Sequence, residues 1–101
     1  MPGFIRITRT MQLEIAHLTV AVRIDISNNR LSGQLPSFKS CPQLRELNCS
    51  RNLFAGELPS FGNCKQLVQF NCANNAFQTL LPSFGQCTKL EIFHCNENQV
   101  P

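Results

Sequence analysis

Cysteine is the residue type with the widest chemical range in this sequence, and its spacing is regular. Six cysteines form two series that recur every 23 positions, one at positions 41, 64 and 87 and the other at positions 49, 72 and 95. Such thiols can form disulfides, bind a metal ion or lie buried as small apolar groups. We interpret them as buried free thiols, because cysteine is among the residues most often found in protein cores.

Disulfides and zinc binding are the alternatives to buried free thiols. If each series lies on successive coils of a parallel sheet, ~4.8 Å apart, the Cα separation alone permits a disulfide. Each series holds three cysteines, however, so pairing within a series leaves one thiol over. Zinc needs four ligands that converge as a tetrahedron, and a straight row without a CxxC pair converges poorly. We therefore expect no metal and no cofactor, while the redox state of the thiols stays open.

A catalytic role is suggested most directly by His94 beside Cys95, a base next to a nucleophile. Adjacent residues of a strand point to opposite faces, so these two side chains cannot easily meet. His17 has no identifiable partner, and the sequence contains no phosphate-binding loop, paired acids or Ser/His/Asp arrangement. The sequence therefore predicts that the protein is not an enzyme.

Composition and charge argue against several other classes of protein. At 101 residues, with 43% hydrophobic and 15% charged residues, the chain has the composition of one small folded domain. Its nine lysines and arginines are scattered among acids and the net charge is +3, so we expect no nucleic-acid partner. No segment approaches the ~18 apolar residues of a membrane span. The apolar stretch from Leu13 to Val22 is interrupted by Glu14 and His17, which makes it a weak signal peptide.

Repetition along the chain organises these groups in space. The tetrapeptide Leu-Pro-Ser-Phe occurs at positions 35–38, 58–61 and 81–84, with the same spacing as the cysteines. The same period relates two further sets, Ile24, Leu47, Phe70 and Phe93, and Asn29, Asn52, Asn75 and Asn98. So many positions with one period predict a stack of units in which each coil packs on the next.

Each unit contains the signals of a short strand followed by a return segment. The alternation Leu47-x-Cys49 places two side chains on one face, as in a β-strand. The proline of each Leu-Pro-Ser-Phe cannot donate to a sheet and ends the pairing nearby. The apolar spacing of three in Phe38-x-x-Cys41-x-x-Leu44 favours an irregular or 3₁₀-like return segment.

The stretch from Leu44 to Pro59 resembles a leucine-rich repeat. It reads Leu-Arg-Glu-Leu-Asn-Cys-Ser-Arg-Asn-Leu-Phe-Ala-Gly-Glu-Leu-Pro. Its Gly-x-Leu-Pro ending resembles the plant-specific subclass, with the consensus LxxLxLxxNxLxGxIP. The units are one residue shorter than is usual in that subclass, and Thr79 replaces the glycine expected in the third unit. The resemblance implies a leucine-rich repeat solenoid with a parallel β-sheet on the concave face and irregular or 3₁₀ return segments on the convex face.

The repeats divide the chain into two parts. Residues 23–101 hold three units and a partial fourth, and residues 1–22 are predicted to be a degenerate N-terminal segment or cap, because Ile15, Leu18 and Ala21 continue the apolar spacing. Residues 1–11 match nothing and are assigned no structure. Because the last unit is incomplete, we expect the native polypeptide to be longer. We also expect the uncapped ends of this chain to permit self-association.

The asparagines at the end of each predicted strand have a structural interpretation. An inward amide can satisfy backbone groups of its own turn and of the next coil, as the asparagine ladder of leucine-rich repeats does. We assign this ladder to Asn29, Asn52, Asn75 and Asn98. Asn48-Cys49-Ser50 matches a glycosylation sequon, which matters only in a secreted chain; we interpret it as accidental because it lies on the predicted binding face.

The outward side chains of the strands form the predicted ligand-binding surface. One column of hydrogen-bonding groups consists of Asp25, Asn48, Asn71 and His94. Ile92 offers an apolar anchor, and Ser50 and Ala73 are also expected to face outward. The other predicted ligand-binding residues are Glu46, Arg51, Gln69 and Asn74.

These features predict a module that binds a protein or peptide ligand on its concave strand face. The alternatives are a structural spacer within a longer solenoid and a fragment of a receptor ectodomain. The compartment stays open, because cysteines without obvious pairing lean towards the cytoplasm, whereas the plant-like repeats favour an extracellular location if the chain is part of a receptor.

Overall fold

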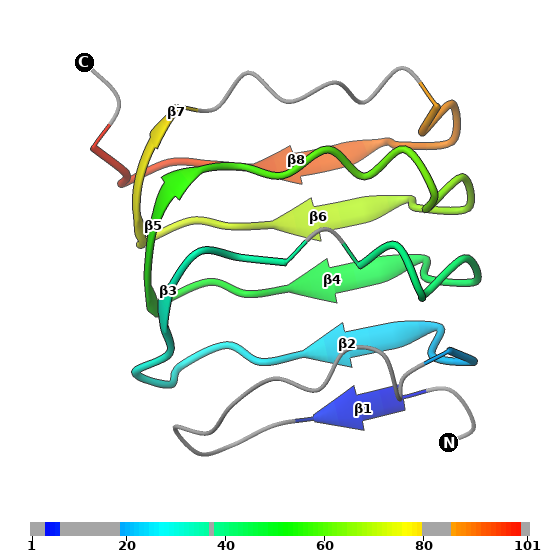
Figure 1. The fold of residues 1–101 in the computed structure, drawn as a ribbon, viewed down its shortest axis with the longest axis horizontal. Helices are drawn as coiled ribbons and strands as arrows, with labels where there is room; N and C mark the ends of the chain where they lie inside the picture. The colour runs from blue at the N-terminus through cyan, green and yellow to red at the C-terminus, as the bar shows by residue number, and fades with distance from the viewer. Residues whose placement is uncertain (1–3, 7–18, 37, 80–85, 100–101) are drawn as a thin grey trace.

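The computed structural model describes residues 4–6, 19–36, 38–79 and 86–99 of the chain. These residues contain eight β-strands and no helix. Successive coils stack on one another, each contributing one strand to a sheet that runs the length of the stack (Figure 1). The coils form a block of 35 × 31 × 19 Å. The predicted fold, a solenoid with a parallel sheet on one face, is confirmed.

The main sheet is parallel, and neighbouring coils pair with the period of the sequence. Its strands, in spatial order, are β1 (Phe4–Arg6), β2 (Arg23–Asp25), β4 (Glu46–Asn48), β6 (Gln69–Asn71) and β8 (Ile92–His94). From β2 to β8 each residue pairs with its equivalent in the next unit, as Ile24 does with Leu47.

The first strand, β1, pairs with β2 at a shorter offset, Phe4 opposite Arg23. β1 belongs to the segment of residues 1–11, for which no structure was predicted from the sequence. Ile15 and Leu18, on which the predicted N-terminal cap was based, lie outside the described residues. Ala21, the third residue of that apolar series, is buried.

A second, smaller sheet was not predicted. It consists of β3 (Ser32–Gly33), β5 (Leu53–Glu57) and β7 (Ala76–Thr79), in the order β3-β5-β7. Gly33 and Gly56 adopt positive φ angles of 84° and 80°, a conformation that glycine enters without steric cost. The pairing of β5 with β7 shifts register after Gly56, so that Glu57 lies opposite Thr79. The irregularity therefore occurs in the unit in which threonine replaces the repeated glycine.

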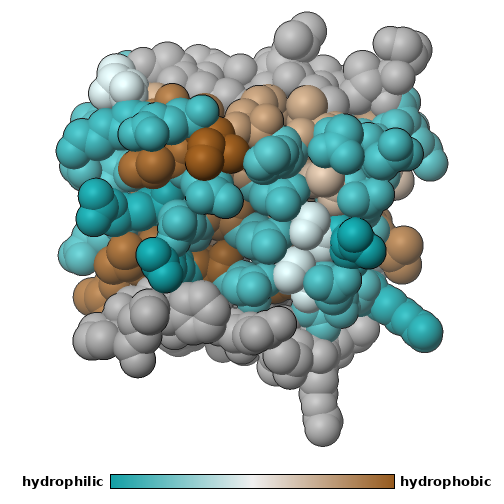
Figure 2. Space-filling model, turned by 180° about the vertical axis from the view of Figure 1, so that it is seen from behind, coloured by the Kyte–Doolittle hydropathy of each residue, from teal (hydrophilic) through white to brown (hydrophobic). Residues whose placement is uncertain are grey.

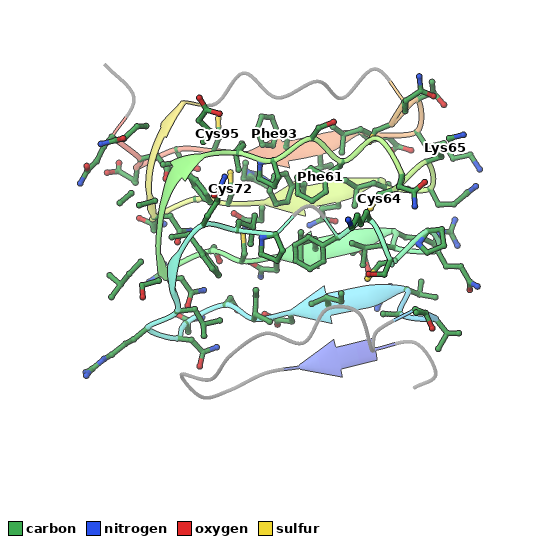
Figure 3. All side chains as sticks on the ribbon, in the orientation of Figure 1. Phe61, Cys64, Lys65, Cys72, Phe93 and Cys95 are labelled. Carbon is green, nitrogen blue, oxygen red and sulfur yellow. The ribbon has the colours of Figure 1, made fainter. Side chains whose placement is uncertain are left out.

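The core lies between the main sheet and the return segments, and its aromatic rings stack from coil to coil. The ring centroids of Phe38 and Phe61 are 5.9 Å apart, and those of Phe70 and Phe93 are 5.6 Å apart. Figure 3 shows Phe61 and Phe93 directed into this layer. Equivalent residues of successive units thus pack on each other, which makes the core continuous along the stack.

The return segments are series of tight turns. The N–H of Cys41 donates to the carbonyl of Phe38 at 3.0 Å, and the N–H of Leu44 donates to the carbonyl of Cys41 at 3.2 Å. Cys64 and Leu67 make the equivalent bonds in the next unit. Hydrogen bonds between residues three apart are those of a 3₁₀ helix, so the predicted 3₁₀-like character is confirmed.

Candidate ligand-binding face

The outward side of β2, β4, β6 and β8, here called the strand face, is covered mainly by hydrophilic side chains (Figure 2). Hydrophobic side chains show between them towards one side of this face (Figure 2). The regular register aligns Asp25 with Asn48, Asn48 with Asn71, and Asn71 with His94. The first three side chains are half-buried and His94 is exposed. The predicted column is therefore a continuous row across four coils.

Three members of this row are held in place by the chain that follows them. Oδ1 of Asp25 accepts a hydrogen bond from the N–H of Ser27 at 3.0 Å. Oδ1 of Asn48 accepts one from the N–H of Ser50 at 3.1 Å and another from its hydroxyl at 2.7 Å. Oδ1 of Asn71 accepts one from the N–H of Ala73 at 3.0 Å. Each side chain thus has a fixed orientation.

These turns also correct part of the sequence-based prediction. Ser50 and Ala73 were expected to face outward, but they are 7% and 5% exposed. The prediction was wrong because the chain leaves the extended conformation after Asn48 and Asn71. Strict alternation of faces holds only within a strand.

The outer amide groups of Asn48 and Asn71 are available to a ligand. With Oδ1 occupied, each side chain retains an Nδ2 donor, which has no hydrogen-bond partner in the described part of the chain. Coils of a parallel sheet lie ~4.8 Å apart, so the two donors are near neighbours. The strand face thus presents oriented donors next to the carboxylate of Asp25.

An ion pair lies beside this row. Nε of Arg23 contacts Oε2 of Glu46, linking β2 to β4. The pair borders a depression of about 180 Å³ on the strand face, here called the Asp25 depression, which is lined by Arg23, Ile24, Asp25, Glu46, Leu47, Asn48 and Gln69. The predicted residues Glu46 and Gln69 therefore share one depression with the Asp25–Asn48 row. Ile92 is 40% exposed on β8, the last strand.

The predicted ligand-binding residues Arg51 and Asn74 lie where the chain turns away from the strand face. Both are exposed, with positive φ angles of 57° and 59°. Asn28 and Glu97 occupy the equivalent positions with the same conformation. These four residues place the following asparagine of each unit towards the interior.

The interior asparagines link each coil to the coil before it. Nδ2 of Asn75 donates to the carbonyl of Cys49, one unit earlier, at 3.0 Å, while its Oδ1 accepts from the N–H of Phe54 at 3.1 Å. Asn52 and Asn98 make equivalent bonds. Nδ2 of Asn29 donates to carbonyls of its own turn, those of Ile26 and Ser27.

The family model for Leucine Rich Repeat matches residues 22–41 and 43–64 of this chain. These units are leucine-rich repeats. The matched residues include β2 and β4, with the Asp25–Asn48 part of the strand face. Comparison with curated proteins found no match.

Solved structures of plant receptor ectodomains are similar to this chain. One is the leucine-rich repeat ectodomain of the receptor kinase GASSHO1/SCHENGEN3 from Arabidopsis thaliana, solved in complex with CASPARIAN STRIP INTEGRITY FACTOR 2. Its TM-score is 0.83 and its identity 28%, over 95% of this chain and 12% of that chain. Another is the Arabidopsis receptor kinase HAESA, solved in complex with the peptide hormone IDA and the co-receptor SERK1. Its TM-score is 0.79 and its identity 27%, over 90% of this chain and 16% of that chain.

A third similar structure is the leucine-rich repeat ectodomain of the receptor kinase SOBIR1 from Arabidopsis thaliana. Its TM-score is 0.74 and its identity 27%, over 92% of this chain and 52% of that chain. The chain thus spans between 12% and 52% of the length of these three ectodomains. None of its described residues lies in a helix long and apolar enough to cross a membrane.

The six cysteines of the chain line the interior. Five are buried and Cys95, in the last coil, is half-buried. The thiol of Cys64 donates to the carbonyl of Phe38 at 3.3 Å, and that of Cys87 to the carbonyl of Phe61 at 3.3 Å. Burial raises the pKa of Cys64 and of Cys72 to about 12. The described residues contain no cluster of three or more cysteine, histidine or acidic side chains that could hold a metal.

Arg23 and Arg45 are not among the predicted ligand-binding residues. Arg23 forms the ion pair with Glu46, and Arg45 lines a second depression next to it. The signal for Arg45 was present in the repeat, because its position is occupied by valine one unit earlier and one unit later, at Val22 and Val68. The next residue of this column is Glu91, so its members alternate between valine and a charged residue, and Arg45 is the basic one.

Proposed function

We propose that the strand face binds an extended segment of a protein or peptide. The observation that carries this proposal is the row of Asp25, Asn48 and Asn71, whose Oδ1 atoms are each held by the main-chain N–H two residues later. The outer polar atoms of these side chains are therefore oriented before a ligand arrives. Preorganised groups lose little conformational entropy on binding, which favours affinity.

The row offers hydrogen bonds that suit the main chain of a ligand. The Nδ2 groups of Asn48 and Asn71 can donate to carbonyl oxygens, Asp25 can accept from an N–H group, and His94 can do either. The exposed part of Ile92 adds apolar contact at one end of the row. The residues proposed to surround the ligand are Glu46, Arg51, Gln69 and Asn74.

The comparisons support this class of ligand. HAESA was solved with the peptide hormone IDA and the co-receptor SERK1, and GASSHO1/SCHENGEN3 with CASPARIAN STRIP INTEGRITY FACTOR 2. The leucine-rich repeat ectodomains of both receptor kinases are similar to this chain over 90% or more of its length. A protein or peptide ligand is therefore the partner best supported for the strand face.

Selection from a library of random linear peptides displayed on phage tests the proposal. The affinity of the enriched peptides is then measured for the wild type and for the double variant Asn48→Asp with Asn71→Asp. Aspartate retains the Oδ1 acceptor, as Asp25 shows, but replaces the outer donor by an acceptor. We expect the double variant to lose at least about tenfold in affinity, since two hydrogen bonds become repulsive contacts.

The matched control is Lys65→Gln with Lys89→Gln, which lowers the net charge by the same amount in the return segments. Both lysines are exposed, and Figure 3 shows Lys65 at the periphery of the molecule. An equal loss of affinity in the control would place the ligand elsewhere. If the wild type enriches no peptide, the spacer alternative replaces the proposal.

A further inference from the structure

A second depression, here called the Arg45 groove, lies next to the Arg23–Glu46 ion pair. It has a volume of about 330 Å³ and is lined by Val22, Arg23, Arg45, Glu46 and Val68. The Asp25 depression also includes Arg23 and Glu46. The ion pair is therefore shared by the two depressions, with Asp25 in one and Arg45 in the other.

The charge of Arg45 is not neutralised within the described part of the chain. Its guanidinium makes no ion pair or hydrogen bond there, and its side chain is exposed. In contrast, Arg23 and Glu46 neutralise each other in the same groove. Because arginine stays protonated at physiological pH, the Arg45 groove carries one uncompensated positive charge.

The base of Arg45 is rigid and its neighbours are apolar. The N–H of Arg45 donates to the carbonyl of Val22 at 2.8 Å, and its carbonyl accepts from the N–H groups of Val68 at 2.8 Å and Gln69 at 3.0 Å. The side chains of Val22 and Val68, on the adjacent coils, are half-buried. The groove thus combines a guanidinium, attached to main chain that is held in place, with aliphatic surface on both sides.

We infer that the Arg45 groove binds an acidic side chain, aspartate or glutamate, of the peptide held by the strand face, with an aliphatic residue of that peptide packed on Val22 and Val68. This inference rests on the proposed function. The planar guanidinium matches a carboxylate and can form two parallel hydrogen bonds to it. An aliphatic residue of the ligand packed on Val22 and Val68 would shield the pair of charges from water, which would strengthen their attraction.

The peptide selection provides the test, extended to three variants. We expect peptides enriched on the wild type to contain an aspartate or glutamate next to valine, leucine or isoleucine. One enriched peptide is synthesised in its acidic form and with that residue changed to the corresponding amide. Arg45→Gln should lower the affinity for the acidic peptide about tenfold, because a charge-assisted hydrogen bond is lost. Its affinity for the amide peptide should not change.

Charge reversal and a matched control complete the experiment. Selection on Arg45→Glu should enrich lysine or arginine in place of the acidic residue. Arg30→Gln, the same change at an exposed arginine beyond the other end of β2, should leave the affinity for the acidic peptide unchanged.

The outcomes separate this inference from the proposed function. Enriched peptides without an acidic residue, or an unchanged affinity in Arg45→Gln, would overturn the inference. If the Asn48/Asn71 variant still loses affinity in that case, the proposed function stands. If the wild type enriches no peptide, both fail together.

Discussion

Nδ2 of Asn52 donates a 2.8 Å hydrogen bond to the carbonyl of Ile26, which lies one coil away in space. Oδ1 of Asn52 accepts a hydrogen bond from the N–H of Leu31 at 3.1 Å, also in the earlier coil. The side chain is 6% exposed. One buried amide therefore satisfies a main-chain acceptor and a main-chain donor of a neighbouring unit.

We predict that Asn52→Ala lowers the free energy of unfolding by about 3 kcal/mol, because it leaves buried main-chain groups unsatisfied at about 1–3 kcal/mol each. The matched variant is Asn71→Asp, which retains the Oδ1 acceptor for the N–H of Ala73. Because Asn71 lies opposite Asn48 and His94 and not opposite an acid, this change should alter stability by less than about 0.5 kcal/mol. Urea unfolding followed by circular dichroism measures both. Equal midpoints for the two variants would contradict the structural role of Asn52.

Arg51→Asn is predicted to stabilise the protein. Arg51 has a φ angle of 57°, and Asn28 and Asn74 occupy the equivalent positions of other units with the same conformation. Asparagine enters the left-handed region more readily than arginine does, so the gain should be about 0.5–1 kcal/mol. Thermal unfolding of Arg51→Asn is compared with that of Arg30→Asn, which changes an exposed arginine outside these positions. A gain of similar size in Arg30→Asn would show that backbone strain is not the cause.

The thiols should differ in reactivity according to their burial. We predict that iodoacetamide at pH 8 modifies Cys95 first, because Cys95 is half-buried whereas the other five cysteines are buried. Mass spectrometry with peptide mapping gives the rate for each site. All six should react in denaturant without a reductant. Fewer than six modified thiols there would indicate disulfides, and equal native rates at Cys95 and Cys49 would contradict the burial of Cys49.

Stability should fall as the pH rises above about 9. Burial raises the pKa of Cys64 and of Cys72 from 9.0 to about 12. Between these values the unfolded chain has lost thiol protons that the folded chain retains, so the free energy of unfolding decreases by up to about 1.4 kcal/mol per pH unit for each thiol. Below pH 8 both states are protonated and this contribution is fully present.

Urea unfolding under reducing conditions from pH 7 to pH 10.5 checks this dependence. The chain contains no tyrosine, so no phenol titrates in the same range. Cys64→Ala removes one of the thiols and should show a shallower decline above pH 9, whatever its stability at pH 7. Identical slopes for the variant and the wild type would rule out ionisation of Cys64 as a cause.

The constant repeat period predicted the stack of coils, the resemblance to leucine-rich repeats added its parallel sheet, and the apolar spacing of three predicted the 3₁₀-like turns. A periodic sequence places equivalent residues in equivalent environments, so Leu47 and Phe70, which occupy the same position in successive units, are both buried. The period by itself also aligned Asp25, Asn48, Asn71 and His94. These features depend on which residues repeat, and a single sequence records that directly.

The tertiary structure decided the features that depend on how one coil meets the next. β1 was not predicted, because its residues pair with those of β2 at a sequence offset shorter than the repeat period, with Phe4 opposite Arg23. The second sheet and the burial of Ser50 follow from the local backbone conformation at each turn. Arg23 and Glu46 lie directly opposite each other in β2 and β4, and the orientation of their side chains completes the ion pair. A repeat period brings two residues into the same column, but the geometry of the turns decides which of their atoms meet. The repeat alone places Arg45 between Val22 and Val68, but only the tertiary structure decides whether a neighbouring side chain neutralises its charge, because that depends on which side chains come within contact distance.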